Sequence, residues 1–212
     1  MVFRYPDWFI KYLCLLALLL SVGQASVSGQ SLEMMPGTER FFTDVQWLEF
    51  FGDDRKWSLF SRSRATSDYK ENTSLFTGAY LNYTSMLGLG GTVVGRISSL
   101  GAGGDAGVHL FKADKKILIY ALASLGLSRE LSYSWFSIVR FTPPLVSDWD
   151  LYSSVELFSN FDQFGHTASV QRMRLGVGVH GCQFGMALNL SGIGMNYQNR
   201  DSNPGIFIRK QF

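Results

Sequence analysis

The sequence predicts an all-β protein, a single antiparallel transmembrane β-barrel. Three observations support this fold class: an export signal at the start, polar and apolar residues that alternate with a period of two after residue 56, and aromatic residues near the ends of the apolar stripes. The composition agrees, because 15% aromatic and only 17% charged residues exclude a disordered chain. The 22 Gly against 5 Pro favour many turns and close backbone contacts over long helices, which fits an all-β chain.

Residues 1–25 have the pattern of a secretory signal peptide. Arg4 and Lys11 precede an apolar stretch over 13–22, and small residues before and at Ala25 predict cleavage after it. Ten apolar residues rise only about 15 Å as a helix, roughly half the thickness of a hydrocarbon core. A membrane anchor is therefore disfavoured, and we expect the mature chain to be exported.

Residues 26–55 form a lead-in segment that the sequence leaves open. Between residues 41 and 51 the apolar positions fit a further strand or a short interfacial helix, which Thr43 or Asp44 would cap. If this segment is a strand, the turn signal Pro36-Gly37 allows a short partner before it, and the barrel has twelve strands. We expect ten strands, with twelve as the alternative.

Residues 56–212 are expected to form the barrel itself. They contain ten stretches in which every second residue forms a largely apolar stripe, with Lys210 as the only charge on it. These stretches are 57–65, 75–83, 87–97, 106–110, 117–125, 131–141, 149–157, 169–177, 182–190 and 206–212. An even number of strands also agrees with the connectors, which place both chain ends on the periplasmic side.

A soluble β-sandwich would show the same alternation, but its outer stripe should be rich in Lys, Glu and Asp. Here the polar stripe combines arginines and amides with aromatic residues such as Phe60 and Tyr80, which suits an enclosed lumen. Nine charged residues of this stripe are expected to form a cluster in the lumen: Arg62, Arg64, Arg96, Asp105, Arg140, Glu156, Arg172, Arg174 and Arg209. Seven positive charges against two negative ones would make any narrow pore prefer anions.

The last eight residues, Gly205 to Phe212, resemble the terminal assembly signal of Gram-negative outer-membrane barrels. Ile206, Ile208 and Phe212 match its apolar alternation and its terminal aromatic residue, while Lys210 stands where an apolar residue is more usual. A lysine at this place can still reach the lipid headgroups with its ammonium group. The resemblance implies insertion by the barrel-assembly machinery.

Two further stretches, 56–62 and 203–207, resemble a group of uncharacterised outer-membrane proteins of the Bacteroidetes. This resemblance implies a barrel in the bacterial outer membrane, with membrane lipid around it. It implies nothing about an activity, because the group has none that can be carried over to these residues.

The sequence offers no convincing catalytic constellation. His109 and Asp105 share a stripe but lie about 13 Å apart along one strand, too far for a base and its orienting group. His166, near Ser159 at the outer end of its strand, is the only histidine well placed for chemistry on outer-leaflet lipid, and we interpret it as a polar residue at a loop edge. Cys182 falls on the lipid-facing stripe, where a thiol behaves as a small apolar group.

No metal-ligand spacing, phosphate loop or cofactor motif is found, and a net charge of +2 without a dense basic run argues against nucleic acid as a partner. Three functions remain. We expect a structural barrel, or one that binds a ligand or a protein partner that the sequence does not identify. A narrow anion-preferring pore is the alternative, and an outer-leaflet lipid-modifying enzyme is the second alternative.

Overall fold

The structure is a computed structural model that describes residues 29–70, 72–99, 101–128 and 131–212, so the predicted signal peptide lies outside the described residues. The strands are β1 (Ser31–Pro36), β2 (Arg40–Phe51), β3 (Trp57–Asp68), β4 (Thr73–Thr84), β5 (Leu89–Ser98), β6 (Gly101–Ala113), β7 (Ile117–Gly126), β8 (Ser132–Phe141), β9 (Pro144–Val146), β10 (Trp149–Asp162), β11 (Gly165–Val179), β12 (Cys182–Ile193) and β13 (Asn199–Gln211). One turn of 3-10 helix, η1 (Met195–Tyr197), precedes β13. Among the described residues, no helix is both long and apolar enough to span a membrane.

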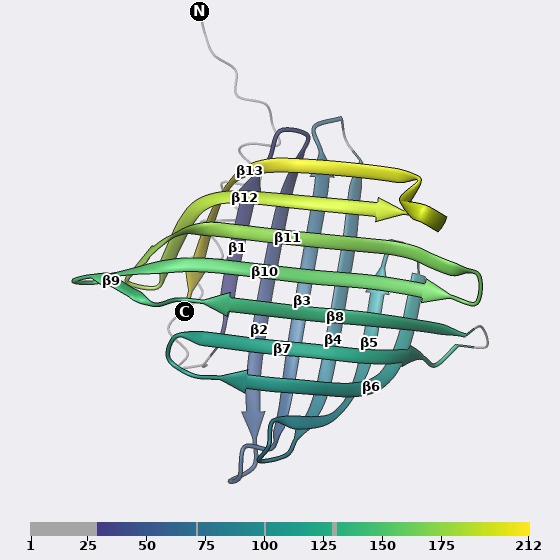
Figure 1. The fold of residues 1–212 in the computed structure, drawn as a ribbon, viewed down its shortest axis with the longest axis horizontal. Helices are drawn as coiled ribbons and strands as arrows, with labels where there is room; N and C mark the ends of the chain where they lie inside the picture. Colours follow the sequence, from purple (N-terminus) through teal and green to yellow (C-terminus); the bar gives the residue numbers. More distant parts are fainter. Residues whose placement is uncertain (1–28, 71, 100, 129–130) are drawn as a thin grey trace, which may run out of the picture.

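Twelve of the described strands close into an antiparallel barrel. Neighbours in the chain pair with each other, β8 pairs with β10 across the short β9, and β1 closes the ring by pairing with β13. The three-residue β9 pairs only with β10. Figure 1 shows β7 to β13 crossing the front of the view and β1 to β5 running behind them at a steep angle, as two walls of a strongly tilted barrel.

The structure corrects the preferred count of ten strands to the alternative of twelve. Residues 41–51 belong to β2, and its short partner β1 begins the barrel at Ser31, within the predicted lead-in segment 26–55. Trp47 is exposed on the outside of β2 and Asp44 is buried inside, which is the alternation of a strand. The physical reason is closure, because β1 and β2 cover backbone groups of β13 and β3 that would otherwise form open edges.

The outward face of the barrel is apolar, and aromatic rings gather at both of its ends. Val93 is 55% exposed, as expected for a side chain that points away from the barrel interior. The ring centroids of Trp57 and Tyr83 lie 5.0 Å apart at one end, and those of Tyr133 and Phe161 lie 5.0 Å apart at the other. The residues of the predicted assembly signal are exposed as well: Ile206, Ile208 and Phe212. This arrangement is typical of a lipid-facing belt between two aromatic girdles.

Both described chain ends lie at one end of the barrel, which we call the inner end, together with the connectors that follow β2, β4, β6 and β11. At the opposite, outer end, the β1–β2 turn is fixed by Asn203 of β13. Its Oδ1 accepts hydrogen bonds from the backbone N–H groups of Glu39 at 3.0 Å and Arg40 at 3.2 Å, and its Nδ2 donates to the Arg40 carbonyl at 3.0 Å. A single side chain thus joins the first hairpin to the last strand.

Candidate functional site

A network of ion pairs crosses the middle of the barrel interior. Glu156 of β10 is buried and faces three arginines. Arg62 Nη1 and Arg172 Nη1 each lie 2.6 Å from its carboxylate, and Arg64 Nη2 lies 2.5 Å from it. Asp44 of β2 accepts a hydrogen bond from Arg62 Nε at 2.8 Å. Alternation along the strands turns these side chains inward, so that charges from the two opposite walls of the barrel meet.

β1 adds a further ion pair beside this network. Arg174 Nε donates to Glu33 at 2.8 Å, and Arg174 Nη1 donates to the amide oxygen of Asn189 at 2.9 Å. The Cζ atoms of Arg172 and Arg174 lie 5.1 Å and 5.7 Å from the centre of the Phe42 ring, within the range of cation–π attraction. The buried carboxylates are therefore surrounded by guanidinium groups that also pack on an aromatic face.

We call these seven charged residues the ion-pair layer: Glu33, Asp44, Glu156, Arg62, Arg64, Arg172 and Arg174. Six of these residues, all but Arg64, line a small cavity together with Arg140 and Tyr152, and its volume is only about 20 Å³. A water molecule needs at least roughly 10–15 Å³ of such space, so the layer has room for about one. This cavity is too small for a solute larger than water.

The nine charged residues that the sequence placed in the lumen all lie at inward positions of their strands, in three groups. Arg62, Arg64, Glu156, Arg172 and Arg174 belong to the ion-pair layer, Arg96 Nη1 lies 3.2 Å from Asp105, and Arg140 and Arg209 line a cavity on the inner side of the layer. Sequence reasoning missed Glu33 and Asp44, because their segment was not assigned to strands. The twelve-strand reading would have placed both inward, so four carboxylates face the seven arginines.

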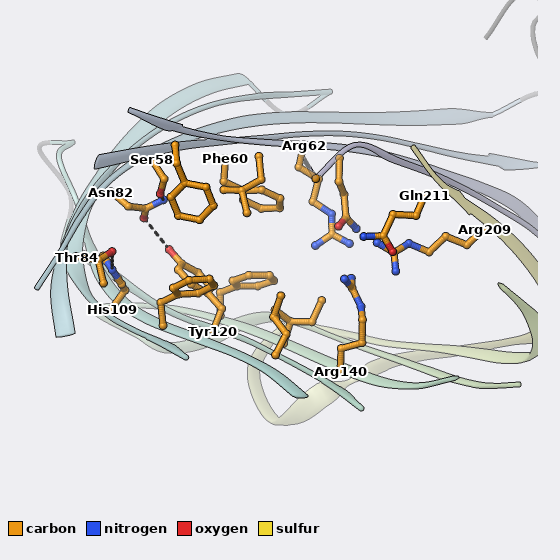
Figure 2. A pocket seen from close by; sticks show the side chains of 18 residues that line it. Ser58, Phe60, Arg62, Asn82, Thr84, His109, Tyr120, Arg140, Arg209 and Gln211 are labelled. Carbon is orange, nitrogen blue, oxygen red and sulfur yellow. Dashed lines mark hydrogen bonds between the residues drawn. The ribbon is translucent and has the colours of Figure 1, made fainter. Parts of the chain in front are cut away.

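The cavity has a volume of about 190 Å³ and lies in the half of the interior nearer the inner end. One end of it is aromatic. The ring centroids of Tyr120 and Phe136 are 6.0 Å apart, and the imidazole of His109 stacks on Tyr120 at 5.6 Å. Figure 2 shows Phe60 and Tyr120 on opposite sides of this end. The wall offers an apolar surface on which a ring can pack.

Hydrogen bonds hold the aromatic end in place. His109 Nε2 lies 2.9 Å from the hydroxyl of Thr84, and its Nδ1 lies 2.7 Å from that of Thr92. Tyr120 donates its hydroxyl to the amide oxygen of Asn82 at 3.1 Å, drawn as a dashed line in Figure 2. Asp105 forms its ion pair with Arg96 instead, so the two residues that share a stripe do not form a catalytic pair. His109 has a structural role in this wall.

The other end of the cavity is cationic. In Figure 2 the guanidinium groups of Arg62, Arg140 and Arg209 point toward one another. Arg62 is neutralised by the ion-pair layer, but no carboxylate of the described residues forms a salt bridge with Arg140 or Arg209. Arg209 donates only to neutral oxygens, those of Tyr152 and Ser31 at 2.9 Å among them.

The Nε–H groups of Arg140 and Arg209 are also buried without an acceptor in the described part of the chain. Buried donors are nearly always satisfied, by water or a ligand where the protein supplies no acceptor. An anion that enters the cavity would meet two uncompensated positive charges and unsatisfied donors. This end therefore has the chemistry of an anion site.

The cavity continues toward the inner end of the barrel. A second space of about 320 Å³ shares Arg140 and Gln211 with it and extends to Asp114 in the β6–β7 turn. The backbone N–H groups of Lys116 and Ile117 donate to the Asp114 carboxylate at 2.7 and 2.9 Å and hold its pKa below the usual value. A solute would approach the cavity from this inner end.

The other residues that the sequence singled out as candidates for chemistry lie on the barrel surface. Cys182 is a free thiol, and the described ranges hold no group of three or more metal-ligating side chains. His166 lies at the outer end of β11, and its Nε2 is 2.7 Å from the hydroxyl of Ser169. The sequence reading had placed Ser169 on the lipid-facing stripe without a role.

No family model and no curated protein matches this chain. Solved structures match its fold. The chain is similar to the KdgM porin in complex with disordered oligogalacturonate, with 7% sequence identity, a TM-score of 0.51 and coverage of 86% of this chain and 98% of that chain. It is also similar to the NanC porin, with 14% identity, a TM-score of 0.54 and coverage of 87% and 99%. The comparisons establish a porin-like barrel fold and confirm the predicted fold class.

Proposed function

We propose that this protein is an outer-membrane β-barrel with a closed interior that binds a small amphipathic anion in the cavity on its inner side. The observation that carries the proposal is the pairing, in one 190 Å³ cavity, of an aromatic wall with Arg140 and Arg209, which have no carboxylate partners among the described residues. The proposal is the ligand-binding form of the function expected from the sequence.

Three features support the outer membrane as the location. The outward face is apolar between two aromatic girdles, as in barrels that span the outer membrane. The predicted signal peptide provides export, and porins share the fold. The C-terminal strand places Ile206, Ile208 and Phe212 on the outside, where the assembly machinery would read them.

The size and polarity of the cavity define the ligand. An apolar cavity of about 150 Å³ can hold benzene, so 190 Å³ accommodates one six-membered ring with a carboxylate. The carboxylate would accept charge-assisted hydrogen bonds from Arg140 and Arg209, and the ring would pack on Tyr120 and Phe136. We therefore propose a benzoate-like carboxylate as the ligand class.

The ion-pair layer is the reason to favour binding over conduction. An anion that reached Arg140 from the inner end would still face the 20 Å³ space among Glu156, Arg62 and their partners. Passage requires a wider path than one water molecule. A conducting role would need these ion pairs to separate, at a cost of several kcal/mol for each exposed charge.

The binding proposal is tested by calorimetry on the refolded protein in detergent, with benzoate and uncharged benzyl alcohol as probes. We expect benzoate to bind at least about tenfold more tightly, because a hydrogen bond to a charged group contributes about 1.5–3 kcal/mol. Arg140→Gln should remove this preference. Arg96→Gln is the matched control, since it removes the same charge from an interior arginine that does not line the cavity. Equal binding of both probes, or unchanged benzoate binding by Arg140→Gln, would refute the proposal.

A further inference from the structure

A row of small and polar residues crosses the outward face of four strands near the outer end. Ser159 of β10 is paired in register with Ser169 of β11, Ser169 with Gly192 of β12, and Gly192 with Arg200 of β13. Polar and charged groups that gather on the outward face of a barrel mark a candidate functional site. The row therefore needs an explanation other than barrel stability.

A β-bulge directs a histidine onto this row. The register between β10 and β11 shifts between Asn160 and Phe161, where β11 has one extra residue, Thr167. The side chains of Asn160 and Thr167 fix the bulge, because Asn160 Nδ2 donates to Thr167 Oγ1 at 2.8 Å. The extra residue reverses the alternation, so His166 faces outward and packs edge-on against Phe161, with ring centroids 5.6 Å apart.

The hydrogen bonds of His166 define which nitrogen carries the proton. Its Nδ1 lies 2.9 Å from the carbonyl oxygen of Gly194, which can only accept, so Nδ1 is the protonated nitrogen. Nε2 is then an acceptor, 2.7 Å from Ser169 Oγ, and Ser169 donates to it. Ser159 Oγ lies 2.8 Å from Ser169 Oγ and donates to it in turn. The result is a serine hydroxyl aimed at a histidine base, with the imidazole fixed by a third group.

A groove of about 470 Å³ runs beside this serine. Ser169, Leu190, Tyr197 and Arg200 are among its lining residues. The Tyr197 ring lies 4.1 Å from the His166 ring and above Gly192, where a Cβ atom would come within 2.7 Å of Tyr197 Cδ1. Glycine at this place thus makes room for the tyrosine that borders the groove. Leu190 offers an apolar contact for an acyl chain, and the Arg200 guanidinium offers positive charge for a phosphate or an oxyanion.

The level of the row relative to the membrane identifies the reacting bond. Trp135 of β8 pairs in register with Ser159, and the stacked Tyr133 and Phe161 lie close by, so the row lies within the outer aromatic girdle. Aromatic girdles mark the headgroup boundary of the bilayer. Among the lipid bonds found at this boundary are the carboxylic esters that join acyl chains to the glycerol or sugar backbone.

We propose that Ser169 and His166 are a catalytic nucleophile and base that hydrolyse an acyl ester of an outer-leaflet lipid. Ser169 Oγ attacks the carbonyl carbon while His166 Nε2 takes the hydroxyl proton, and the proton then passes to the departing alcohol as the acyl group stays on Ser169. Water from the outer surface attacks the acyl-serine while His166 takes one of its protons, and this proton then passes to Ser169 Oγ as the fatty acid leaves, which restores the serine hydroxyl and the neutral imidazole. This activity is independent of the proposed ligand site inside the barrel.

The test uses the refolded full-length mature protein in detergent micelles, with folding verified by gel mobility before and after heating. A fluorophosphonate probe should label Ser169, identified by peptide mass spectrometry, and the protein should hydrolyse a p-nitrophenyl ester of a medium-chain fatty acid. Ser169→Ala should abolish labelling and hydrolysis, and His166→Gln should lower the hydrolysis rate about 100-fold or more.

Ser124→Ala is the matched control. Ser124 is 6% exposed, as Ser169 is, and its Oγ lies 2.8 Å from that of Ser134, but this pair lies inside the barrel without a histidine. The control should be labelled by the probe and should hydrolyse the p-nitrophenyl ester like the wild type. Two kinds of vesicle, one of diacyl phospholipid and one of lipid A, then distinguish the two sources of the ester. The vesicle from which fatty acid is released identifies the substrate. A folded wild type that is not labelled, a Ser169→Ala variant that hydrolyses like the wild type, or release from neither lipid would overturn the proposal.

Discussion

Glu156 is the residue whose loss should destabilise the barrel most. Its carboxylate is buried and contacts Arg62, Arg64 and Arg172 at 2.5–2.6 Å. Glu156→Gln keeps the shape of the side chain and removes its charge, so the change reports on electrostatics rather than packing. The seven interior arginines then face three carboxylates in place of four.

The expected cost follows from the geometry of these contacts. Two unit charges 4 Å apart attract by about 4 kcal/mol at an effective dielectric constant near 20. The sum of three such attractions overestimates the net contribution, because desolvation of the buried charges opposes them. Removing one partner of a buried ion pair typically costs about 3–5 kcal/mol, since the remaining charge stays buried. We therefore expect Glu156→Gln to lower the free energy of unfolding by about 3–5 kcal/mol.

Urea unfolding in lipid vesicles, followed by tryptophan fluorescence, measures this difference. Asp201→Asn is the control, because its ion pair with Arg40 at 2.5 Å is partly exposed at the outer end and should contribute at most about 1 kcal/mol. The double variant Glu156→Gln/Arg172→Gln should recover part of the loss, since it removes one charge of each sign. Equal effects of Glu156→Gln and Asp201→Asn would refute the reasoning.

Three further predictions concern the outside, the rim and maturation. Val155→Arg should lower the free energy of unfolding by about 2–4 kcal/mol, because Val155 is exposed midway between the rim aromatics Trp149 and Phe161. Unchanged stability in vesicles would contradict its lipid-facing position. Asn203→Ala should cost about 1–3 kcal/mol in the same assay, since it leaves backbone groups of the β1–β2 turn without partners; a wild-type unfolding midpoint would show that the turn is held by other contacts. Intact-mass spectrometry of the protein purified from outer membranes should give a chain that begins at Ser26, and a mass that includes residues 1–25 would contradict the predicted cleavage.

The barrel and much of its interior were predictable because alternation with a period of two is a strong signal. Arg140 and Glu156 each stand between apolar neighbours that face outward, and one register assigns the whole strand. The same signal placed Val93 and Val139 on the outside, where the structure shows them exposed. These positions needed no knowledge of the tertiary structure.

The preferred count of ten strands was wrong because the residue pattern of one segment does not show which strands pair to close the barrel. Phe41 to Phe51 is apolar at both periods, and only pairing with β1 and β3 decides for a strand. Glu33 and Asp44 were missed for the same reason. Seven arginines facing two carboxylates signalled missing partners, because enclosed charges of one sign are costly unless they are paired or hydrated.

The surroundings of His166 could not be predicted, because one extra residue changed their geometry. Strict alternation from Arg172 would turn His166 into the lumen, and the bulge at Thr167 turns it outward onto Ser169. Bulges depend on pairing between strands rather than on the residues of one strand. The contact between these two side chains is therefore a property of the tertiary structure.

The central claim is that the ion-pair layer closes the barrel, and single-channel recording in planar bilayers tests it most directly. The wild-type protein should insert without stepwise conductance, because the space among Glu156, Arg62 and their partners is about 20 Å³. Stable, reproducible conductance steps from folded protein would contradict the claim. If reversal potentials in a salt gradient then showed a preference for the anion, the anion-preferring pore would be supported instead.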